Sequence, residues 1–342
     1  MPLMIVRNDI VKMNVDVIVN SANPYPTIGQ GVDGQIHKYA GKELLEARRE
    51  IGNIACGEAF ITSGFQLPAK YVIHTVGPTH TNQEVSELLR NCYKNSLYLA
   101  LEHSCESIAF PLISTGIYGV NKVKALQIAI QTIHEFLFEH EMMVYIVVYD
   151  KESYQISEQL YAKIESYIDE NYIEEVYVPY PRAYESQYER RNVFTEAVRA
   201  FREPIVEYEE EYICEETTEM RSLEDLMDEV DDTFSEHLFR MIDYKGMKDP
   251  EVYKKANIDR RLFSKIRSNK YYQPSKNTAL SLAFALELNL DETKELLIKA
   301  GYALSNSNKV DIIVKYFIEQ KNYNIYELNE VLFKFTETTL GG

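Results

Sequence analysis

The chain of 342 residues contains only four cysteines, and no two of them form a CxxC pair. Cysteines spaced in this way fit neither a disulfide framework nor a zinc site. No apolar run approaches the roughly 20 residues needed to cross a bilayer, and the N-terminal MPLMIVRNDI lacks the features of a secretory signal. These absences predict a cytoplasmic protein that binds no membrane and uses no metal or cofactor.

Composition and charge divide the chain into three parts. Hydrophobic residues make up 45% of the sequence, which excludes collagen-like and wholly disordered proteins, and the length suits two domains. The formal net charge of -17 is spread unevenly, with -7 over residues 1–170, -13 over 171–232 and +3 over 233–342. An acidic protein can therefore carry a basic module at its C-terminal end.

In residues 1–170, short β-branched runs alternate with helical patterns, an order typical of α/β proteins. Continuous apolar strands indicate a sheet covered on both faces, so we expect a three-layer αβα domain. The predicted strands are 16–20, 69–77, 107–114 and 144–150, preceded by a strand-like pattern in MPLMIVRNDI at the N-terminus. The predicted helices lie near 33–50, 84–103, 122–140 and 153–170.

The rest of the sequence changes character twice. Residues 171–232 are rich in Tyr and Glu and lose all periodicity, which predicts an acidic linker. From 233 to 342 the pattern is helical only, with segments separated by Asn, Gly, Pro and Asp. We therefore expect a second, all-α domain joined to the first through the linker.

Two loops in the first half carry the strongest chemical signal. One apolar strand leads into NSANPYPTIGQGVDG, residues 20–34, in which a glycine-containing loop delivers an aspartate at the start of a helix. A second apolar strand leads into STGIYG, residues 114–119. Loop glycines let the backbone approach a ligand, and helix N-terminal amides favour anions. We expect the two loops to hold a diphosphate between them.

These motifs, followed in order by GEAFIT, AKYVIHTVGP and AFPLISTGIYG, resemble the macrodomain, the ADP-ribose-binding module. Within that family they are most similar to the catalytic class, which removes ADP-ribose or acetyl groups from ADP-ribosyl compounds. The resemblance covers roughly residues 1–170 and implies an αβα fold with a mixed sheet, with ADP-ribose or an ADP-ribosylated macromolecule as the partner. The family's run of four glycines reads IGQG here, after PYP, so the loop at the distal ribose is stiffer than the family pattern.

The resemblance also implies roles for individual residues. Asp9 is expected to accept a hydrogen bond from the adenine amino group, with Ile10 and Tyr149 beside the base. Asn20 and Asn23 are expected near the distal ribose. The first phosphate and ribose loop would contain Gly29, Gly31, Val32 and Asp33, and the second would contain Ser114, Thr115, Gly116, Ile117, Tyr118 and Gly119.

Hydrolysis would depend on Asp33. We hypothesise that this carboxylate orients or deprotonates a water between the diphosphate and the distal ribose, while Asn20 holds the ribose hydroxyls. Taken singly, Asp33 is also explained as a helix cap, and the two asparagines as turn residues. A non-catalytic sensor, in which bound ADP-ribose alters association with DNA or protein, and an adaptor with a vestigial pocket remain as alternatives.

The segment from residue 245 to 297 resembles a phage-repressor-type helix-turn-helix domain. A short helix would turn at Asn257, which tolerates left-handed backbone, into a second helix beginning at Asp259. Residues 245–276 hold ten basic and three acidic side chains, as expected for a surface that contacts DNA. A dimerisation or docking unit is the alternative. The candidate nucleic-acid contacts are Arg260, Arg261, Lys265 and Arg267.

Overall fold

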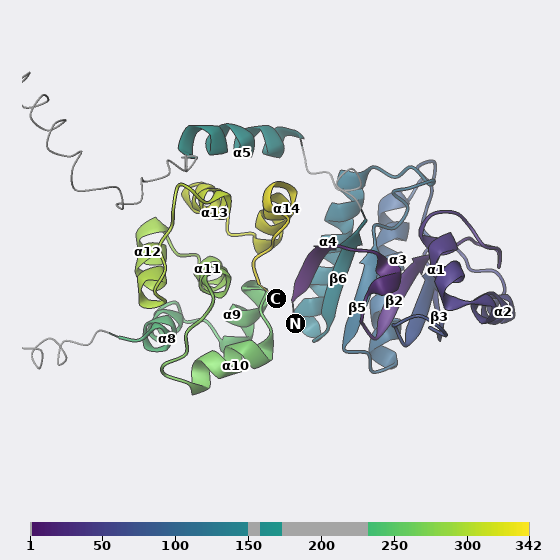
Figure 1. The fold of residues 1–342 in the computed structure, drawn as a ribbon, viewed down its shortest axis with the longest axis horizontal. Helices are drawn as coiled ribbons and strands as arrows, with labels where there is room; N and C mark the ends of the chain where they lie inside the picture. The colour runs from purple at the N-terminus through teal and green to yellow at the C-terminus, as the bar shows by residue number, and fades with distance from the viewer. Residues whose placement is uncertain (1, 150–157, 173–231, 342) are drawn as a thin grey trace, which may run out of the picture. The chain divides into compact units, whose positions relative to one another are not determined.

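A computed structural model describes residues 2–149, 158–172 and 232–341 (Figure 1). Six strands form one sheet in the order β1-β6-β5-β2-β4-β3. All neighbouring strands are parallel except β3, which runs antiparallel to β4. This mixed sheet confirms the predicted fold class. The bounds are β1 Leu3–Arg7, β2 Val17–Ser21, β3 Ala59–Ser63, β4 Tyr71–Thr75, β5 Ser107–Pro111 and β6 Met143–Val148.

Helices cover both faces of the sheet, because its strands are apolar on both sides. Phe110 on β5 packs with Leu97 and Ile133 from α3 and α4 in one buried cluster. Val72 on β4 packs with Ile36 and other residues of α1 and α2 in a second cluster. The three-layer αβα prediction is therefore confirmed. The helix bounds are α1 Val32–Ala40, α2 Lys42–Ile51, α3 Val85–Glu102, α4 Lys122–Glu139 and α5 Glu158–Asn171.

In this domain one local prediction was wrong and one strand was missed. The helix expected near 33–50 is two helices, because Gly41 between them has a φ of 92° that no helix can contain. Strand β3 was not predicted; it lies at the edge of the sheet, and its residues are mostly half-buried or exposed, so it lacks the apolar run of an inner strand. Residues 150–157 and nearly all of the predicted linker lie outside the described residues, so the linker remains a prediction.

The C-terminal region is all-helical, as predicted. Several of its helices begin at side chains that cap the free backbone N–H groups of the first turn. Thr233 and Asn289 form capping boxes with Glu236 and Glu292. No described helix is both long and apolar enough to span a membrane. The bounds are α8 Phe234–Tyr244, α9 Asp249–Lys255, α10 Arg260–Ser268, α11 Lys276–Ala285, α12 Leu290–Lys299, α13 Lys309–Glu319 and α14 Ile325–Thr336.

The turn between α9 and α10 behaves as its sequence indicated. Asn257 has a φ of 54°, and Asp259 caps α10 by accepting from the Arg261 N–H. The Asn257 side chain is buried and bonds to the backbone of the edge strand β1. Its Oδ1 accepts from the Leu3 N–H at 2.8 Å, and its Nδ2 donates to the Leu3 carbonyl at 2.9 Å. The amide thus supplies hydrogen-bond partners to the backbone of Leu3 on the side of β1 that pairs with no strand among the described residues.

Candidate functional site

The two predicted loops meet at the carboxyl ends of β2, β5 and β6. Together they line a cavity of about 270 Å³, the place where ligands bind in open α/β sheets. The predicted residues that line it are Asn23, Gly31, Val32, Asp33, Ser114, Thr115, Gly116, Ile117, Tyr118 and Tyr149. Ser21, Gln30, Leu112 and residues 147–148 complete much of the wall without having been predicted.

The glycines of the first loop allow its backbone conformation. Gly31 is the N-cap of α1 and has a φ of 65°, a conformation that favours glycine. A Cβ on Gly34 would lie 2.7 Å from the carbonyl oxygen of Gly29, and a Cβ on Gly29 would lie 3.0 Å from Asn23 Nδ2. The loop therefore folds tightly onto the start of α1, and this places Asp33 in the first turn of that helix.

The second loop contains a residue in an unfavourable backbone conformation. Ser114 has a φ of 66° and is buried, and its Oγ has no hydrogen-bond partner among the described residues. The turn is closed by bonds from the Val120 N–H to the Ser114 carbonyl and from the Gly119 N–H to the Gly116 carbonyl, both 3.0 Å. Backbone strain of this kind often marks a ligand site, and the loop leaves Ile117 75% exposed at the cavity.

Asp33 is held at both carboxylate oxygens. Asn20 Nδ2 donates to Oδ1 at 2.6 Å, and the Gly29 N–H donates to Oδ2 at 2.5 Å. Asn20 is fully buried and does not line the cavity. Of the two predicted asparagines it is Asn23 that reaches the cavity, and its Nδ2 also donates to the Thr27 carbonyl at 3.2 Å. Asn20 thus contacts Asp33 on the side away from the cavity.

The residues predicted for the adenine end are close to one another along the sheet edge. The Asn8 N–H donates to the Val148 carbonyl at 3.1 Å, which brings the neighbours Asp9 and Tyr149 to the same end of β1 and β6. Asp9 caps a short 3-10 helix, Ile10–Lys12, by accepting from the Val11 N–H. Asp9, the buried Ile10, Gly29 and Gly119 do not line the cavity itself, whereas Tyr149 is 75% exposed there.

Comparison with known proteins decides the family. The Macro domain family model matches residues 19–129. A macro domain-containing protein of Chlorobaculum tepidum is 54% identical over 134 residues, which are 39% of this chain and 78% of that protein. The chain belongs to the macrodomain family. The O-acetyl-ADP-ribose deacetylase of Escherichia coli K12 is 46% identical over 164 residues, 46% of this chain and 93% of that protein. This second relationship supports the prediction that the macrodomain is an enzyme.

Among solved structures, the Oceanobacillus iheyensis macrodomain with ADP is 43% identical to this chain. The match covers 48% of this chain and 90% of that one, with a TM-score of 0.43. Each of these matches spans less than half of the present sequence.

The macrodomain site contains one important residue that the sequence did not reveal. Arg48 of α2 is only 2% exposed, and its Nη2 donates to the carbonyls of Asn23 and Pro24 at 3.2 and 3.3 Å. It thereby fixes the beginning of the first loop. Burial lowers the pKa of this guanidinium, an effect that the negative charge of Asp33 opposes. In the sequence, Arg48 is one of several charged residues on an amphipathic helix, so no pattern marked it.

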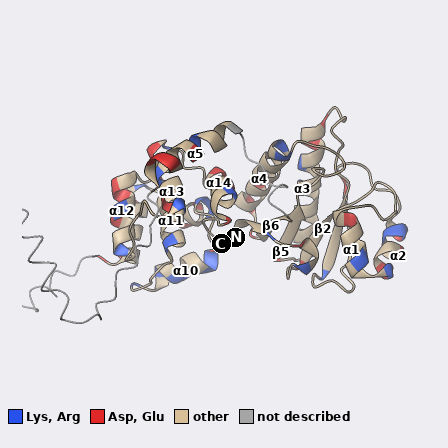
Figure 2. Ribbon diagram, turned by 45° about the horizontal axis from the view of Figure 1, so that its top comes forward, with Lys and Arg blue, Asp and Glu red and all other residues tan. Residues whose placement is uncertain are grey.

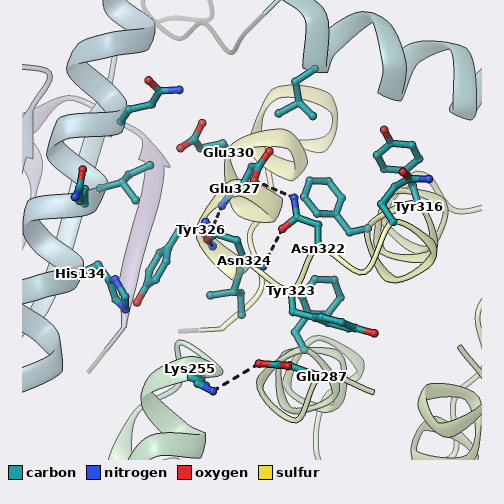
Figure 3. A pocket seen from close by; sticks show the side chains of 18 of the residues that line it. His134, Lys255, Glu287, Tyr316, Asn322, Tyr323, Asn324, Tyr326, Glu327 and Glu330 are labelled. Atoms are coloured by element: carbon teal, nitrogen blue, oxygen red, sulfur yellow. Dashed lines mark hydrogen bonds and ion pairs between the residues drawn. The ribbon is translucent and has the colours of Figure 1, made fainter. Parts of the chain in front are cut away.

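A larger cavity of about 900 Å³ lies elsewhere, lined by residues of α4, α5, α9, α11, α13 and α14. Figure 3 shows its aromatic and acidic side chains, with Lys255 paired to Glu287 and Asn322 donating to Glu327. Burial raises the pKa of Glu330, on its wall, to about 8. Neither glycine loop contributes to it, so size alone does not identify the site. The described residues contain no cluster of His, Cys, Asp or Glu suited to a metal ion.

The four predicted nucleic-acid contacts are all exposed on α10, whose basic residues are visible in Figure 2. Two of them have partners. Arg267 pairs with Asp249, and its guanidinium lies 4.2 Å from the centroid of the Phe239 ring. Arg260 lies 3.9 Å from a carboxylate oxygen of Glu141. Arg261 and Lys265 form no ion pair with any described residue.

Proposed function

We propose that the macrodomain binds ADP-ribose and hydrolyses compounds that carry it, either by deacetylating O-acetyl-ADP-ribose or by removing mono-ADP-ribosyl groups. The observation that carries this proposal is the single cavity lined by both loops together with Asn23 and Asp33. Loop backbone and the N-terminal turn of α1 favour a diphosphate. The exposed ring of Tyr149 offers a surface on which adenine can stack.

Asp33 would act on the attacking water. Its carboxylate has about four acceptor positions, and Asn20 and Gly29 occupy two of them. A water in the cavity can therefore donate to a remaining lone pair. In deacetylation, the water oxygen attacks the acetyl carbonyl carbon, Asp33 takes the water proton, and the ester bond breaks as that proton passes to the ribose oxygen. In ADP-ribosyl removal the same water would attack the anomeric carbon, Asp33 would take the water proton, and the bond from that carbon to the modified group would break as the proton passes to the leaving atom.

The test is a product-release assay on a panel of substrates: O-acetyl-ADP-ribose, an ester-linked ADP-ribosyl protein and an N-linked one. Calorimetry with ADP-ribose measures binding separately, and Asp33→Ala is the control. Release of acetate or ADP-ribose by the wild-type protein, lost in the variant, supports the proposal. Binding without product would favour the alternative of a non-catalytic sensor. Absence of binding at millimolar ADP-ribose would contradict both.

We further propose that α10 contacts nucleic acid through its exposed basic residues, as a helix-turn-helix module would. This second proposal is favoured by Arg261 and Lys265, two exposed cations on one helix without a carboxylate partner among the described residues. Fluorescence anisotropy with duplex DNA at low salt tests it on the full chain. The triple variant of Arg260, Arg261 and Lys265 to Ala should bind more weakly and with a shallower salt dependence. No binding by the wild-type chain would overturn this proposal.

A further inference from the structure

A line of buried polar side chains crosses three strands behind Asp33. Asn20 on β2 is in register with His74 on β4, and Thr62 lies on β3, the next strand. Asn20 and His74 are 0% exposed and Thr62 is 9% exposed. They lie on the sheet face that α1 covers, beside Val72. Burying a polar group costs free energy unless the group is hydrogen-bonded. Among the described residues Asn20 Oδ1 has no partner, whereas Asn20 Nδ2, both ring nitrogens of His74 and Thr62 Oγ1 each have at least one.

The hydrogen bonds along this line can run in one direction only. The Asp33 carboxylate accepts and cannot donate, so Asn20 Nδ2 must donate to its Oδ1. The second hydrogen of that nitrogen faces His74 Nδ1 at 3.2 Å, which must therefore be the acceptor nitrogen of the ring. The ring proton then sits on Nε2 and is donated to Thr62 Oγ1 at 2.9 Å. The Thr62 hydroxyl in turn donates to the Val72 carbonyl at 3.4 Å.

The other tautomer of His74 is incompatible with this arrangement. A proton on Nδ1 would meet the amide hydrogen of Asn20. Rotating the amide would relieve that clash but would place the Asn20 oxygen against Asp33 Oδ1, in the position where the nitrogen now lies at 2.6 Å. Two negatively polarised oxygens at that distance repel. By accepting from Nε2, Thr62 therefore selects the tautomer that keeps the carboxylate bound.

We propose that Thr62 and His74 are positioning residues, which act through Asn20 to hold the Asp33 carboxylate in its reactive orientation. We call the three residues Thr62, His74 and Asn20 the relay. None of them lines the cavity, so the relay acts on Asp33 and leaves ligand contacts to the loops. This inference rests on the proposed hydrolysis. Residues that orient a reactive group from behind it commonly change activity by about 10- to 100-fold in metal sites, and we expect an effect of that order.

The groups packed against the relay keep His74 neutral. His37 of α1 has its ring centroid 6.4 Å from that of His74, and Asp33 and the buried Arg48 lie on α1 and α2. Burial, followed by repulsion from Arg48 and His37, lowers the pKa of His74 to about 3. The hydrogen bonds of the relay therefore run in the same direction at weakly acidic, neutral and alkaline pH. The relay adds no pH dependence to the activity across that range.

The experiment compares Thr62→Val, which removes the hydroxyl at nearly constant shape, with Thr62→Ser, which keeps it. Thr132→Val is the matched control, because the Thr132 hydroxyl is also buried but bonds within α4, to the Ile128 carbonyl at 2.7 Å. The full chain is used throughout. The measurements are kcat on the released product, the Kd for ADP-ribose by calorimetry, the melting temperature, and the tautomer of His74 from ¹⁵N chemical shifts.

We expect Thr62→Val to lower kcat by about 10-fold or more while the Kd for ADP-ribose stays near the wild-type value. Thr62→Ser should restore kcat, and Thr132→Val should not lower it. The His74 ring should be protonated at Nε2 in the wild type and lose that preference in Thr62→Val. An unchanged kcat in a folded Thr62→Val, or an Nδ1-protonated ring in the wild type, would overturn the inference. A wild-type chain without product release would instead refute the proposed hydrolysis, and the tautomer would still test the relay.

Discussion

Replacing Asp33 should destabilise the first loop and also lower the rate of hydrolysis. The Asp33 carboxylate is buried and accepts two hydrogen bonds. Each bond to a charged group contributes about 1.5–3 kcal/mol. In Asp33→Asn the amide can keep one acceptor, but its NH₂ group must then face a donor, either Asn20 Nδ2 or the Gly29 N–H. We expect a loss of about 2–3 kcal/mol for Asn, and a larger loss for Ala, which removes both acceptors.

Thermal unfolding of the wild type and the two variants measures this effect. A domain of 150–250 residues loses roughly 2–4 °C per kcal/mol, so Asp33→Asn should melt about 4–12 °C lower. Hydrolysis should fall by about 10²- to 10⁴-fold, as for loss of a general base. Amide hydrogen exchange at Gly29 should speed up in both variants. Wild-type melting together with near-wild-type turnover in Asp33→Asn would refute both the structural and the catalytic role.

Three further predictions concern loop shape, loop anchoring and pH. Gly34→Ala should lower ADP-ribose affinity measured by calorimetry, because its Cβ would lie 2.7 Å from the Gly29 carbonyl oxygen; wild-type affinity would contradict this. Arg48→Met should cost about 1–3 kcal/mol in urea unfolding, since the loop carbonyls lose their buried donor; an unchanged midpoint would argue against that anchor. Burial raises the pKa of Glu330 from 4.5 to about 8, so its contribution to stability is full below pH 4.5 and is lost as pH rises through about 8. From acidic pH to pH 9, the melting temperature of Glu330→Gln should therefore fall less than that of the wild type. An equal fall in both proteins would disprove the assignment.

The features that could be predicted are those set by residues close together in the sequence. Apolar runs identified β2, β4, β5 and β6, and the strand-like pattern at the N-terminus corresponds to β1. The glycine-containing segments after β2 and β5 identified both loops of the cavity, because apolar strands and loop glycines leave a local signal. The edge strand β3 and the break at Gly41 were missed, since a half-exposed strand and a single glycine within a helical pattern are weak signals. In the same way, Asn257 was correctly expected to have left-handed backbone, a property of its residue type.

The internal contacts of the site could not be predicted, because they join residues from separate segments. Asn20 and Asn23 look equivalent in NSAN, yet one lies on a strand and faces Asp33 while the other follows the strand end and reaches the cavity. Thr62 and His74 come from other strands, and their relation to Asn20 appears only once the register of β2, β4 and β3 is known. Which side chains support a reactive group is thus a property of the assembled sheet.

The contacts at the start of α10 limit how this helix can contact a nucleic acid. In a helix-turn-helix module the N-terminal end of the second helix approaches the bases, but here the Asn257 side chain in the preceding turn is buried against Leu3, and Arg260 lies near Glu141. Arg261 and Lys265 are four residues apart and so share one side of the helix. Contact with phosphates through the middle of α10 is therefore compatible with the described structure, whereas base reading from the turn would require the bonds between Asn257 and Leu3 to break first.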